Sequence, residues 1–472
     1  MCKRLRLLRI GARRAATYTL GMREAFKLNC GLRLAGALLA VCIAAWPAKA
    51  LFAQAKFPQS QEYRLIGYDE AARHNPVARL QEALASGHVS LEYKNGNGYL
   101  ASLLAALNIA SSSQTLVFSA TSLQRDLIGP HAPRALYFND STYVGFVQNS
   151  TIIEIITIDE RLGIVFYTFD NRPETRDWFQ RAGQTCLVCH DSQGSMSGGV
   201  PMLMALSAAY SLRNQPLKNF SGAGNVEDSM PIADRWGGWY VTGRHGLQAH
   251  LGNVLLQDRS QLDALDDYRT WNIDTLDGGS FFDTSRYLQP TSDIVALLLL
   301  EHQLTVQNQL TYISFKIPAA FERSGLHSAV DVETWDDLPA RGQRLLARML
   351  DKLVHQLMMV DYAPIASRIR GNADYERWFS AQGPTDSSGR SLRELALQDA
   401  LFVYPLSFMV YTSGFDAMPS FARDYVYRQL AACLSGRASC ARNAFYSQSV
   451  ARDALEILAD TKPEFATYLE AR

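Results

Sequence analysis

Two cysteines and a histidine near the middle of the chain have the spacing of a covalent haem-attachment site. Cys186, Cys189 and His190 form the pattern Cys-x-x-Cys-His within the segment TCLVCH. Two thiols at this spacing can add to the two vinyl groups of one porphyrin, and the adjoining imidazole can then bind the iron as its proximal ligand. The pattern therefore predicts one haem c per chain, tethered by the two cysteines and ligated by His190.

Two other kinds of site would use the same cysteines. Half of a zinc site would need a second ligand pair, and the chain contains no second Cys-x-x-Cys. A dithiol redox pair would need a thioredoxin-like strand-to-helix pattern around it, which the neighbouring sequence lacks. Both alternatives stay open, but haem attachment is the favoured interpretation.

The side chain opposite His190 would decide what such a haem can do. A methionine or a second histidine gives a six-coordinate electron carrier, whereas an empty position permits ligand binding and catalysis. The candidates are histidines and methionines that follow the motif: His250, His245, Met230 and His302, and after them Met196, Met202 and Met204. An open site is the remaining alternative.

Several of these residues have a second interpretation. His245 and His250 could hold zinc or copper instead, although no third ligand lies near them in the sequence. His302 follows Glu301 on an otherwise apolar helix face, where it would serve either as an acid-base group or as a hydrogen-bonded core residue. Trp236 and Trp239, which flank two glycines, would pack on a porphyrin edge or form an aromatic turn in the core.

The N-terminus has the features of a secretory signal peptide, which would place the protein where haem is attached in this way. An apolar run at residues 32–45 follows basic residues and precedes the small-x-small triplet Ala48-Lys49-Ala50. The run is shorter than the ~20 residues of a membrane span. We expect residues 1–50 to be a signal peptide, and the mature chain to be periplasmic and without a membrane span. A retained anchor helix is the alternative.

Removal of this leader makes the protein acidic. The whole chain has 46 basic and 46 acidic side chains, and residues 1–50 hold 10 basic and one acidic, which leaves 36 against 45. An acidic chain is not expected to bind nucleic acid. The partners predicted instead are a redox partner protein or a small electron acceptor.

Two cysteines remain outside the leader and the haem motif. Cys433 and Cys440 enclose a short loop, and an even remainder in an exported protein predicts a disulfide between them. Two buried free thiols are the alternative.

Hydrophobic periodicity predicts an α+β chain that is mainly α, with a small antiparallel β meander. Short β-branched and aromatic runs separated by turn-forming residues predict the strands, at 115–119, 135–138, 143–147, 152–158 and 163–169. Apolar stripes at three- and four-residue steps predict long helices near 295–310 and 346–360, and further helices are expected at 171–182, 391–401, 422–433 and 449–460. The expected regions are an N-terminal α+β part (56–170), a cytochrome c-like haem region (171–275) and a helical domain (276–472).

The order of several phrases resembles a known family. These phrases are SLQRDLIGPHAPRALYFNDSTYVGFVQ, the haem motif, RWGGWYVTGRHG, SDIVALLLLEHQ and VYPLSFMVYTSGFDAMP. They are similar to those of secreted bacterial proteins described only as cytochrome c domain-containing, over nearly the whole mature chain. The resemblance implies one covalent haem and an exported location.

Three functions are compatible with these features. A periplasmic mono-haem electron carrier is preferred, because there is one attachment motif and no second cofactor motif. A haem enzyme of peroxidase or oxidase type, with an open or exchangeable distal site, is the alternative, and a sensor or scaffold is the third. The chain has neither a phosphate-binding Gly-rich loop nor a Gly-x-Ser-x-Gly elbow, which argues against nucleotide-dependent and serine-hydrolase functions.

Overall fold

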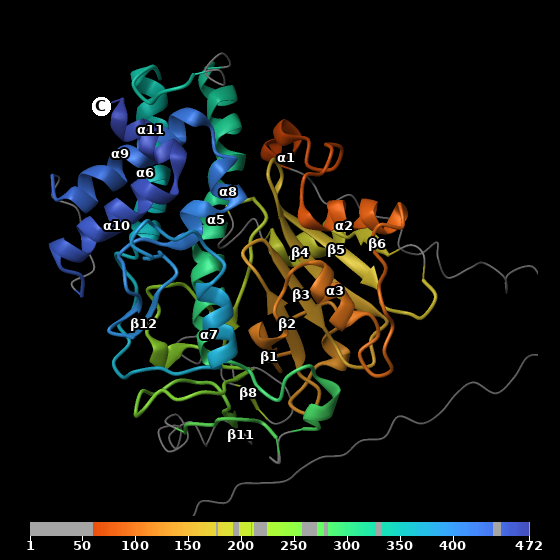
Figure 1. Cartoon of the computed structure of the whole chain (residues 1–472). Coiled ribbons are helices and arrows are strands. Elements are labelled where there is room, and N and C mark those ends of the chain that lie inside the picture. Colours follow the sequence, from red (N-terminus) through yellow and green to blue (C-terminus); the bar gives the residue numbers. More distant parts are fainter. Residues whose placement is uncertain are drawn as a thin grey trace, which may run out of the picture. The chain divides into compact units, whose positions relative to one another are not determined.

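A seven-stranded antiparallel sheet forms the first half of the structure, with strand order β10-β1-β2-β3-β4-β5-β6 (Figure 1). The computed structural model describes residues 60–175, 178–191, 198–208, 210–211, 224–256, 271–277, 282–326, 332–437 and 445–471. The predicted signal peptide lies outside these residues. The strands are β1 (Thr115–Val117), β2 (Arg134–Phe138), β3 (Thr142–Phe146), β4 (Ile152–Asp159), β5 (Gly163–Asp170), β6 (Phe179–Arg181) and β10 (Trp239–Tyr240).

Short polar turns join the central strands. Asn139 follows β2, and its side-chain oxygen accepts hydrogen bonds from the amides of Ser141 and Thr142 at 3.1 and 2.9 Å. Asp159 ends β4 in the same way and accepts from the amides of Arg161 and Leu162, each at 3.0 Å. These Asx-type turns explain why the predicted meander forms, because the side chains replace backbone partners that the reversal removes.

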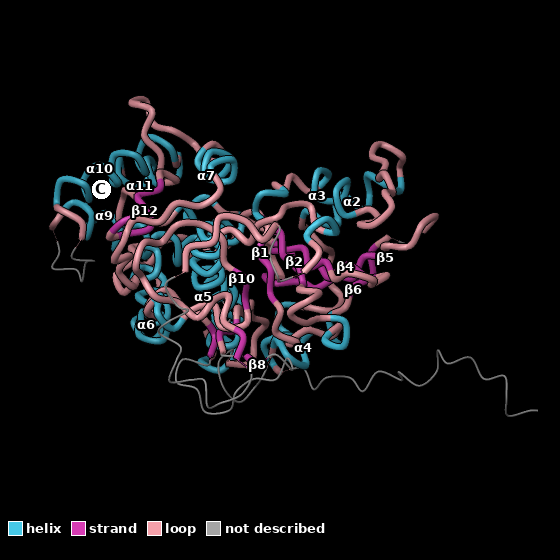
Figure 2. The backbone as a smooth tube through the Cα atoms, turned by 90° about the horizontal axis from the view of Figure 1, so that it is seen from below, coloured by secondary structure: helices cyan, strands magenta, loops and turns pink. Residues whose placement is uncertain are grey.

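Helices cover both faces of the sheet. Asn75 is the N-cap of α2 (Pro76–Ala85), and its side-chain amide group donates to the Asp159 carboxylate at 2.9 Å. Tyr99 precedes α3 (Leu100–Ala106) and packs edge-on against Phe169 of β5. Figure 2 shows α2 and α3 on one side of the sheet and α4 (Gly183–His190) on the other. The short helix that carries the haem motif therefore faces the sheet side opposite to α2 and α3.

A 31-residue helix, α5 (Ile294–Ser324), links the sheet to the helical half of the chain. It begins at Asp293, whose carboxylate accepts a hydrogen bond from the Ala296 amide at 2.8 Å, and it ends at Gly325 with a positive φ of 70°. Most of its residues are buried on every side, which is typical of a central helix. Its first half carries the predicted apolar stripe.

The remaining helices pack around α5 and one another (Figure 1). The Gln309 side chain of α5 donates to the Met349 carbonyl of α6 at 2.8 Å. The helices are α1 (Gln61–Ile66), α6 (Ala340–Leu357), α7 (Ala373–Ser380), α8 (Ser413–Asp416), α9 (Ser420–Ser435), α10 (Gln448–Thr461) and α11 (Pro463–Glu470).

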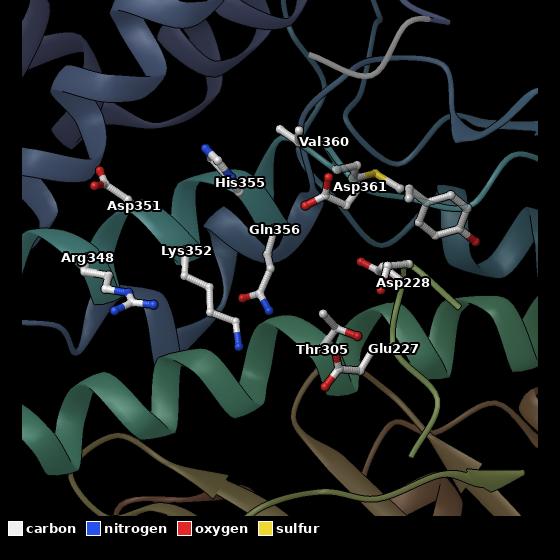
Figure 3. Close-up of a pocket in the computed structure, with 13 residues that line it drawn as sticks. Glu227, Asp228, Thr305, Arg348, Asp351, Lys352, His355, Gln356, Val360 and Asp361 are labelled. Atoms are coloured by element: carbon white, nitrogen blue, oxygen red, sulfur yellow. The ribbon is translucent and has the colours of Figure 1, made fainter. Parts of the chain in front are cut away.

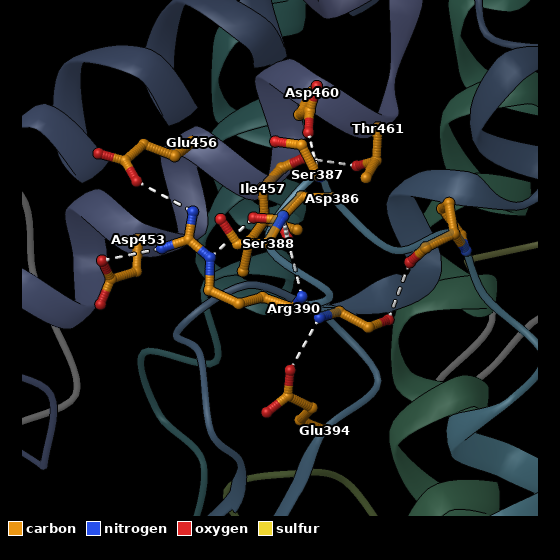
Figure 4. A network of polar contacts seen from close by, with 12 residues as sticks. Asp386, Ser387, Ser388, Arg390, Glu394, Asp453, Glu456, Ile457, Asp460 and Thr461 are labelled. Atoms are coloured by element: carbon orange, nitrogen blue, oxygen red, sulfur yellow. Dashed lines mark hydrogen bonds and ion pairs between the residues drawn. The ribbon is translucent and has the colours of Figure 1, made fainter.

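An Arg-centred network fixes the loop before β12 (Leu395–Gln398) on α10. The Arg390 guanidinium contacts the carboxylates of Asp386, Asp453 and Glu456 at 2.7, 3.2 and 3.0 Å, and Figure 4 shows these contacts converging from the loop and from α10. The Asp386 carboxylate also accepts from the amides of Ser388 and Arg390. The loop is therefore held by its own turn and by the helix beside it.

The α+β class is confirmed, but two predicted helices are wrong. Residues 171–182 contain β6, which pairs with β5 through Thr168 and Gln180. Residues 391–401 contain β12 and β13 (Ala400–Phe402), because Leu397 and Asp399 adopt left-handed φ values of 55° and 63° that a helix cannot contain.

The first two predicted regions contribute strands to one sheet, and all three lie within one compact unit, Lys56–Arg472. The sheet is larger than the predicted small meander, because β6 and β10 from the expected haem region extend it at both edges. In the described part of the chain, no helix is both long enough and apolar enough to cross a membrane.

Candidate functional site

The three motif residues lie together on α4, directly after β6. The Ala182 amide donates to the Phe166 carbonyl at 3.0 Å, which ties the start of the helix to β5. Cys186, Cys189 and His190 follow at helical steps of three and four residues, so that they share one face of the helix. That face is turned toward the sheet, because the His190 ring packs on Phe166 with 4.8 Å between ring centroids.

The tautomer of His190 is set by a backbone carbonyl. Its Nδ1 atom lies 2.7 Å from the Met202 oxygen, so Nδ1–H is the donor and Nε2 keeps its lone pair. Burial lowers the pKa of His190 below its ordinary value, and the bond to Met202 opposes this effect only in part. A neutral histidine oriented through one nitrogen by a carbonyl is the arrangement that metal-ligating histidines use.

A cavity of about 210 Å³ lies between α4 and the sheet, and its mouth is open to solvent. All three motif residues line it, together with mostly apolar side chains from six strands of the sheet, and Leu300 and Leu304 of α5. A cavity of this kind is suited to a flat, apolar ligand with a few polar groups.

The strand register explains which residues reach the cavity. Leu136, Gly145, Glu154 and Thr168 are paired across β2, β3, β4 and β5, so their side chains lie in one row on one face of the sheet. All four residues line the cavity. The intervening residues of each strand point to the face covered by α2 and α3.

Gly145 leaves room in the middle of this row. A Cβ atom there would meet Leu136, Glu154 and Arg134 at 3.4, 3.6 and 3.7 Å, which are ordinary contacts. The protein alone therefore does not require a glycine at this position. A glycine inside a buried strand often marks a place where a ligand approaches the backbone closely.

Polar groups without protein partners line the same cavity. Arg134 and Glu154 form an ion pair at 2.8 Å, but Arg134 Nε and Glu154 Oε1 have no hydrogen-bond partner. The buried hydroxyls of Ser119 and Tyr143 have none either. Buried polar atoms are nearly always satisfied in proteins, so four such atoms around one cavity indicate a ligand with polar groups, or water.

The thiol chemistry argues against a dithiol redox pair. Burial raises the pKa of Cys186 to about 12, with smaller contributions from the charges of Glu154 and Cys189. Reactive dithiols have a thiolate stabilised by a lowered pKa. Cys186 has the opposite environment, whereas Cys189 is exposed.

The two tryptophans occupy different places. Trp239 lines the cavity, and its indole N–H donates to the Leu206 carbonyl at 2.8 Å. Trp236 is fully buried outside the cavity lining and packs against His250, with 5.1 Å between ring centroids. Of the two tryptophans, Trp239 therefore lies in the same cavity lining as the motif residues.

His245 and His250 lie together, away from the cavity lining. Their Nε2 atoms are 3.2 Å apart, and both residues are buried. The His250 Nδ1 atom accepts from the Gly252 amide, so its Nε2 atom carries the proton and is not free to bind a metal. Among the described residues, no group of three or more His, Cys, Asp or Glu could hold a metal ion, which disfavours the zinc or copper alternative.

His302 and Met230 are also separate from the cavity lining. His302 is buried, with Nδ1 2.8 Å from Asp228 and Nε2 2.7 Å from the Ser407 hydroxyl. Glu301 pairs with Arg235 at 2.9 Å. Met230 is partly buried against the core and offers only its backbone oxygen to Arg235. The described lining contains one methionine, Met204.

Asp228, His302 and Ser407 have the bonding order of a serine-hydrolase triad but not its accessibility. Ser407 is fully buried, and its oxygen also accepts from the Met409 amide at 3.1 Å. A nucleophile must reach a substrate carbonyl, and this hydroxyl cannot. The hydrogen bond between His302 and Ser407 therefore has a structural role.

Two predicted residues fall outside the described part of the chain. Cys433 is disulfide-bonded, and its predicted partner, Cys440, lies in the segment 438–444, which the structure does not describe. Met196 likewise lies outside the described residues. Met202, by contrast, is buried and supplies the carbonyl that orients His190.

Sequence patterns alone did not single out Arg134, Tyr143, Gly145 and Glu154. Two signals were present: a glutamate inside the apolar run IIEIITI and a glycine inside YVGFV. Each interrupts a strand that is otherwise apolar. Such interruptions at cavity-facing positions would have identified these residues once the strand register was known.

Family models, curated proteins and solved structures were compared with this chain, and none matches it.

Proposed function

We propose that this protein is a periplasmic c-type cytochrome that holds one covalent haem in the cavity beside α4 and transfers electrons. The observation that carries the proposal is the placement of Cys186, Cys189 and His190 along one wall of a mostly apolar cavity. The apolar run and cleavage triplet at the N-terminus support export.

The residues around the cavity fit a haem. Apolar side chains from the sheet would cover the porphyrin faces, and Trp239 would add a large aromatic surface. Haem also carries two carboxylates, and Arg134 Nε is a buried donor without a partner. A guanidinium is well suited to bind carboxylates, because it presents several donors in one plane.

Each motif residue would have a distinct task. Cys186 and Cys189 would tether the ring, and His190 Nε2 would bind the iron while the Met202 carbonyl keeps the imidazole oriented. When bound, the haem supplies one reversibly exchangeable electron. The chain's own contribution is to exclude water from the apolar cavity and to fix the ligand, which together influence the reduction potential.

The outer face of α4 offers a place for a redox partner. Val188, between the two cysteines, is 64% exposed, and Cys189 is exposed as well. A partner protein or small acceptor that approached this face would lie close to the attachment point.

A haem enzyme is the second candidate function. His245, His250, His302 and Met230 all lie outside the described cavity lining and have other contacts. The lining instead includes the unpartnered hydroxyl of Tyr143. The described lining has no second histidine, and its one methionine, Met204, is the remaining candidate for a distal ligand. Without ligation by Met204, the free Tyr143 hydroxyl would favour an exchangeable distal position. Binding of cyanide and carbon monoxide would support the enzyme, whereas a low-spin spectrum unchanged by both would support the carrier.

The test is expression in a host with a haem-maturation system. A covalently attached haem should be detected by the pyridine haemochrome spectrum and by a mass increase of the denatured chain. The Cys186→Ala/Cys189→Ala double variant should lose the attached haem, while Val188→Ala, which changes the residue between them, should keep it. A colourless wild-type protein with both thiols free to alkylate would refute the proposal.

A further inference from the structure

A second cavity lies on the other side of α5. It is formed by α5, α6 and the loops at residues 227–229 and 359–362, and its volume is about 640 Å³ (Figure 3). Leu300 and Leu304 of α5 line the cysteine cavity, whereas Thr305 lines this one. The two cavities are thus separated by one helix, and the second does not depend on the haem.

Asp228 contributes to this cavity a carboxylate oxygen that has no hydrogen-bond partner. One carboxylate oxygen lies 2.8 Å from His302 Nδ1, and the other, Oδ1, is buried without a partner. The second ring nitrogen of His302, Nε2, lies 2.7 Å from the Ser407 hydroxyl, whose oxygen also accepts from the Met409 amide. Both nitrogens of His302 are therefore engaged, and neither bonds to Oδ1.

The nearby guanidinium does not bond to this oxygen either. Arg235 is fully buried and pairs with Glu301 at 2.9 Å, while its other donors reach the backbone oxygens of Asp228 and Met230. Buried carboxylate oxygens are nearly always hydrogen-bonded, and Asp228 lines the cavity, so Oδ1 is a place for a donor from a ligand.

The groups around Asp228 are also acceptors. Gln356 Oε1 and the Tyr362 hydroxyl line the cavity without hydrogen-bond partners. The carboxylates of Glu227 and Asp361 line it too and form no ion pair within the described residues. Figure 3 shows Asp228 and Asp361 across the gap from Gln356. This end of the cavity suits an ammonium group, which has three donors and a positive charge.

The other end of the cavity is basic. Arg348 and Lys352 are one helical turn apart on α6, both line the cavity, and neither forms an ion pair in the part of the chain that the structure describes. Asp351, which also lines the cavity, forms no ion pair with either of them in the described structure, and its carboxylate accepts from the Tyr425 hydroxyl at 2.6 Å. This end suits a carboxylate.

We propose that the second cavity binds a small zwitterion with a primary ammonium at one end and a carboxylate at the other. Lys352 and Gln356 are four residues apart, which corresponds to about 6 Å along the helix axis. That spacing exceeds the separation of the two charges in an α-amino acid. An ω-amino acid or a short peptide has both charges at a suitable distance.

The proposal is tested by calorimetry on the full chain with matched probes. The probes are 5-aminopentanoate and diglycine, which carry both charges, and pentylamine and pentanoate, which carry one each. Since a zwitterion adds a second set of charge-assisted hydrogen bonds that each single-charge probe lacks, at least one zwitterion should bind about tenfold more tightly than either single-charge probe. The stronger of the two identifies the ligand as an ω-amino acid or a peptide.

Substitutions distinguish the contribution of the acidic end of the cavity from that of the basic end. Asp228→Asn and Tyr362→Phe should weaken the zwitterion and pentylamine, and Lys352→Ala should weaken the zwitterion and pentanoate. Arg344→Ala, on the same helix but outside the cavity lining, should change neither. Tyr362→Phe removes only one oxygen, so it keeps the test valid if Asp228→Asn does not fold. Equal binding of pentanoate and both zwitterions, or unchanged affinity in all three site variants, would overturn the proposal.

Discussion

His190 and Met202 are joined by two reciprocal hydrogen bonds. The Met202 amide donates to the His190 carbonyl at 3.0 Å, and His190 Nδ1–H donates to the Met202 carbonyl at 2.7 Å. The next residue, Leu203, is held by Asn308 of α5 through its amide and its carbonyl, at 2.7 and 2.9 Å. The imidazole is therefore oriented by backbone that the central helix fixes, and not by a mobile side chain.

Replacement of His190 by glycine should separate attachment from ligation. Cys186 and Cys189 remain, so we expect the pyridine haemochrome to be unchanged while the native spectrum becomes high-spin. Added imidazole should restore the low-spin spectrum. Met202→Leu is the matched control, since the bond to His190 uses only the backbone. A wild-type spectrum in the glycine variant would show that His190 does not bind the iron.

Gly145 should tolerate a larger side chain in the haem-free protein but not in the loaded one. A Cβ meets its neighbours at 3.4 Å or more, so Gly145→Ala should fold normally, whereas Gly145→Leu would fill the middle of the cavity wall. We expect haem content per chain to fall from wild type to alanine to leucine, with similar circular dichroism.

Gly224 provides the control for this series. It lies in β9 (Gly224–Asn225), outside the cavity lining, with no heavy atom within 4 Å of an added Cβ. Gly224→Leu should retain the haem. Full haem content in Gly145→Leu would mean that the cofactor does not approach this part of the sheet.

The sequence identified the motif residues because their geometry is local. Three residues within five positions of one helix share a face, whatever the rest of the chain does. Arg134, Tyr143, Gly145 and Glu154 come from three strands, and only the strand register brings them together. His302 illustrates the same limit, since its partners Asp228 and Ser407 are 74 and 105 residues away in sequence.

Replacing one partner of the Arg134–Glu154 ion pair should destabilise the protein more, per substitution, than replacing both. The two side chains are 19% and 20% exposed, so either single change, Arg134→Met or Glu154→Leu, leaves a largely buried charge. We expect each to lower the free energy of unfolding by about 1–3 kcal/mol, and the double variant to lose less than the sum of the two. Urea denaturation of the four haem-free proteins measures this coupling, and additive losses would contradict it.

Reduction of the disulfide should destabilise the C-terminal helices. Cys433 lies at the end of α9 and is disulfide-bonded. For a loop of the predicted size, closed by Cys440, the chain-entropy relation gives about 2–3 kcal/mol. The Cys433→Ser/Cys440→Ser variant should unfold at lower denaturant than wild type and should no longer respond to a reductant. An equal response of wild type and variant to the reductant would contradict this pairing.

Asp293 should make the protein less stable as the pH rises. Its carboxyl is fully buried, and burial raises its pKa from 3.8 to about 7, although the amides of Ala296 and Asn372 donate to it and oppose the shift. The folded state therefore binds this proton more tightly than the unfolded state. The contribution is fully present below about pH 4 and is lost as the pH approaches 7, with a slope of at most ~1.4 kcal/mol per pH unit.

Asp293→Asn removes this titration, because the amide keeps an oxygen that can cap α5 but cannot ionise. Urea denaturation between pH 4 and 7 should show a fall in the free energy of unfolding for wild type that is reduced in the variant. Asp283→Asn is the control. Because the pKa of Asp283 is lowered in the folded protein, its contribution to stability grows as the pH rises, so the fall in the free energy of unfolding seen for wild type should persist in this variant. If wild type and Asp293→Asn lose stability equally over this range, the Asp293 carboxyl is already ionised at pH 4.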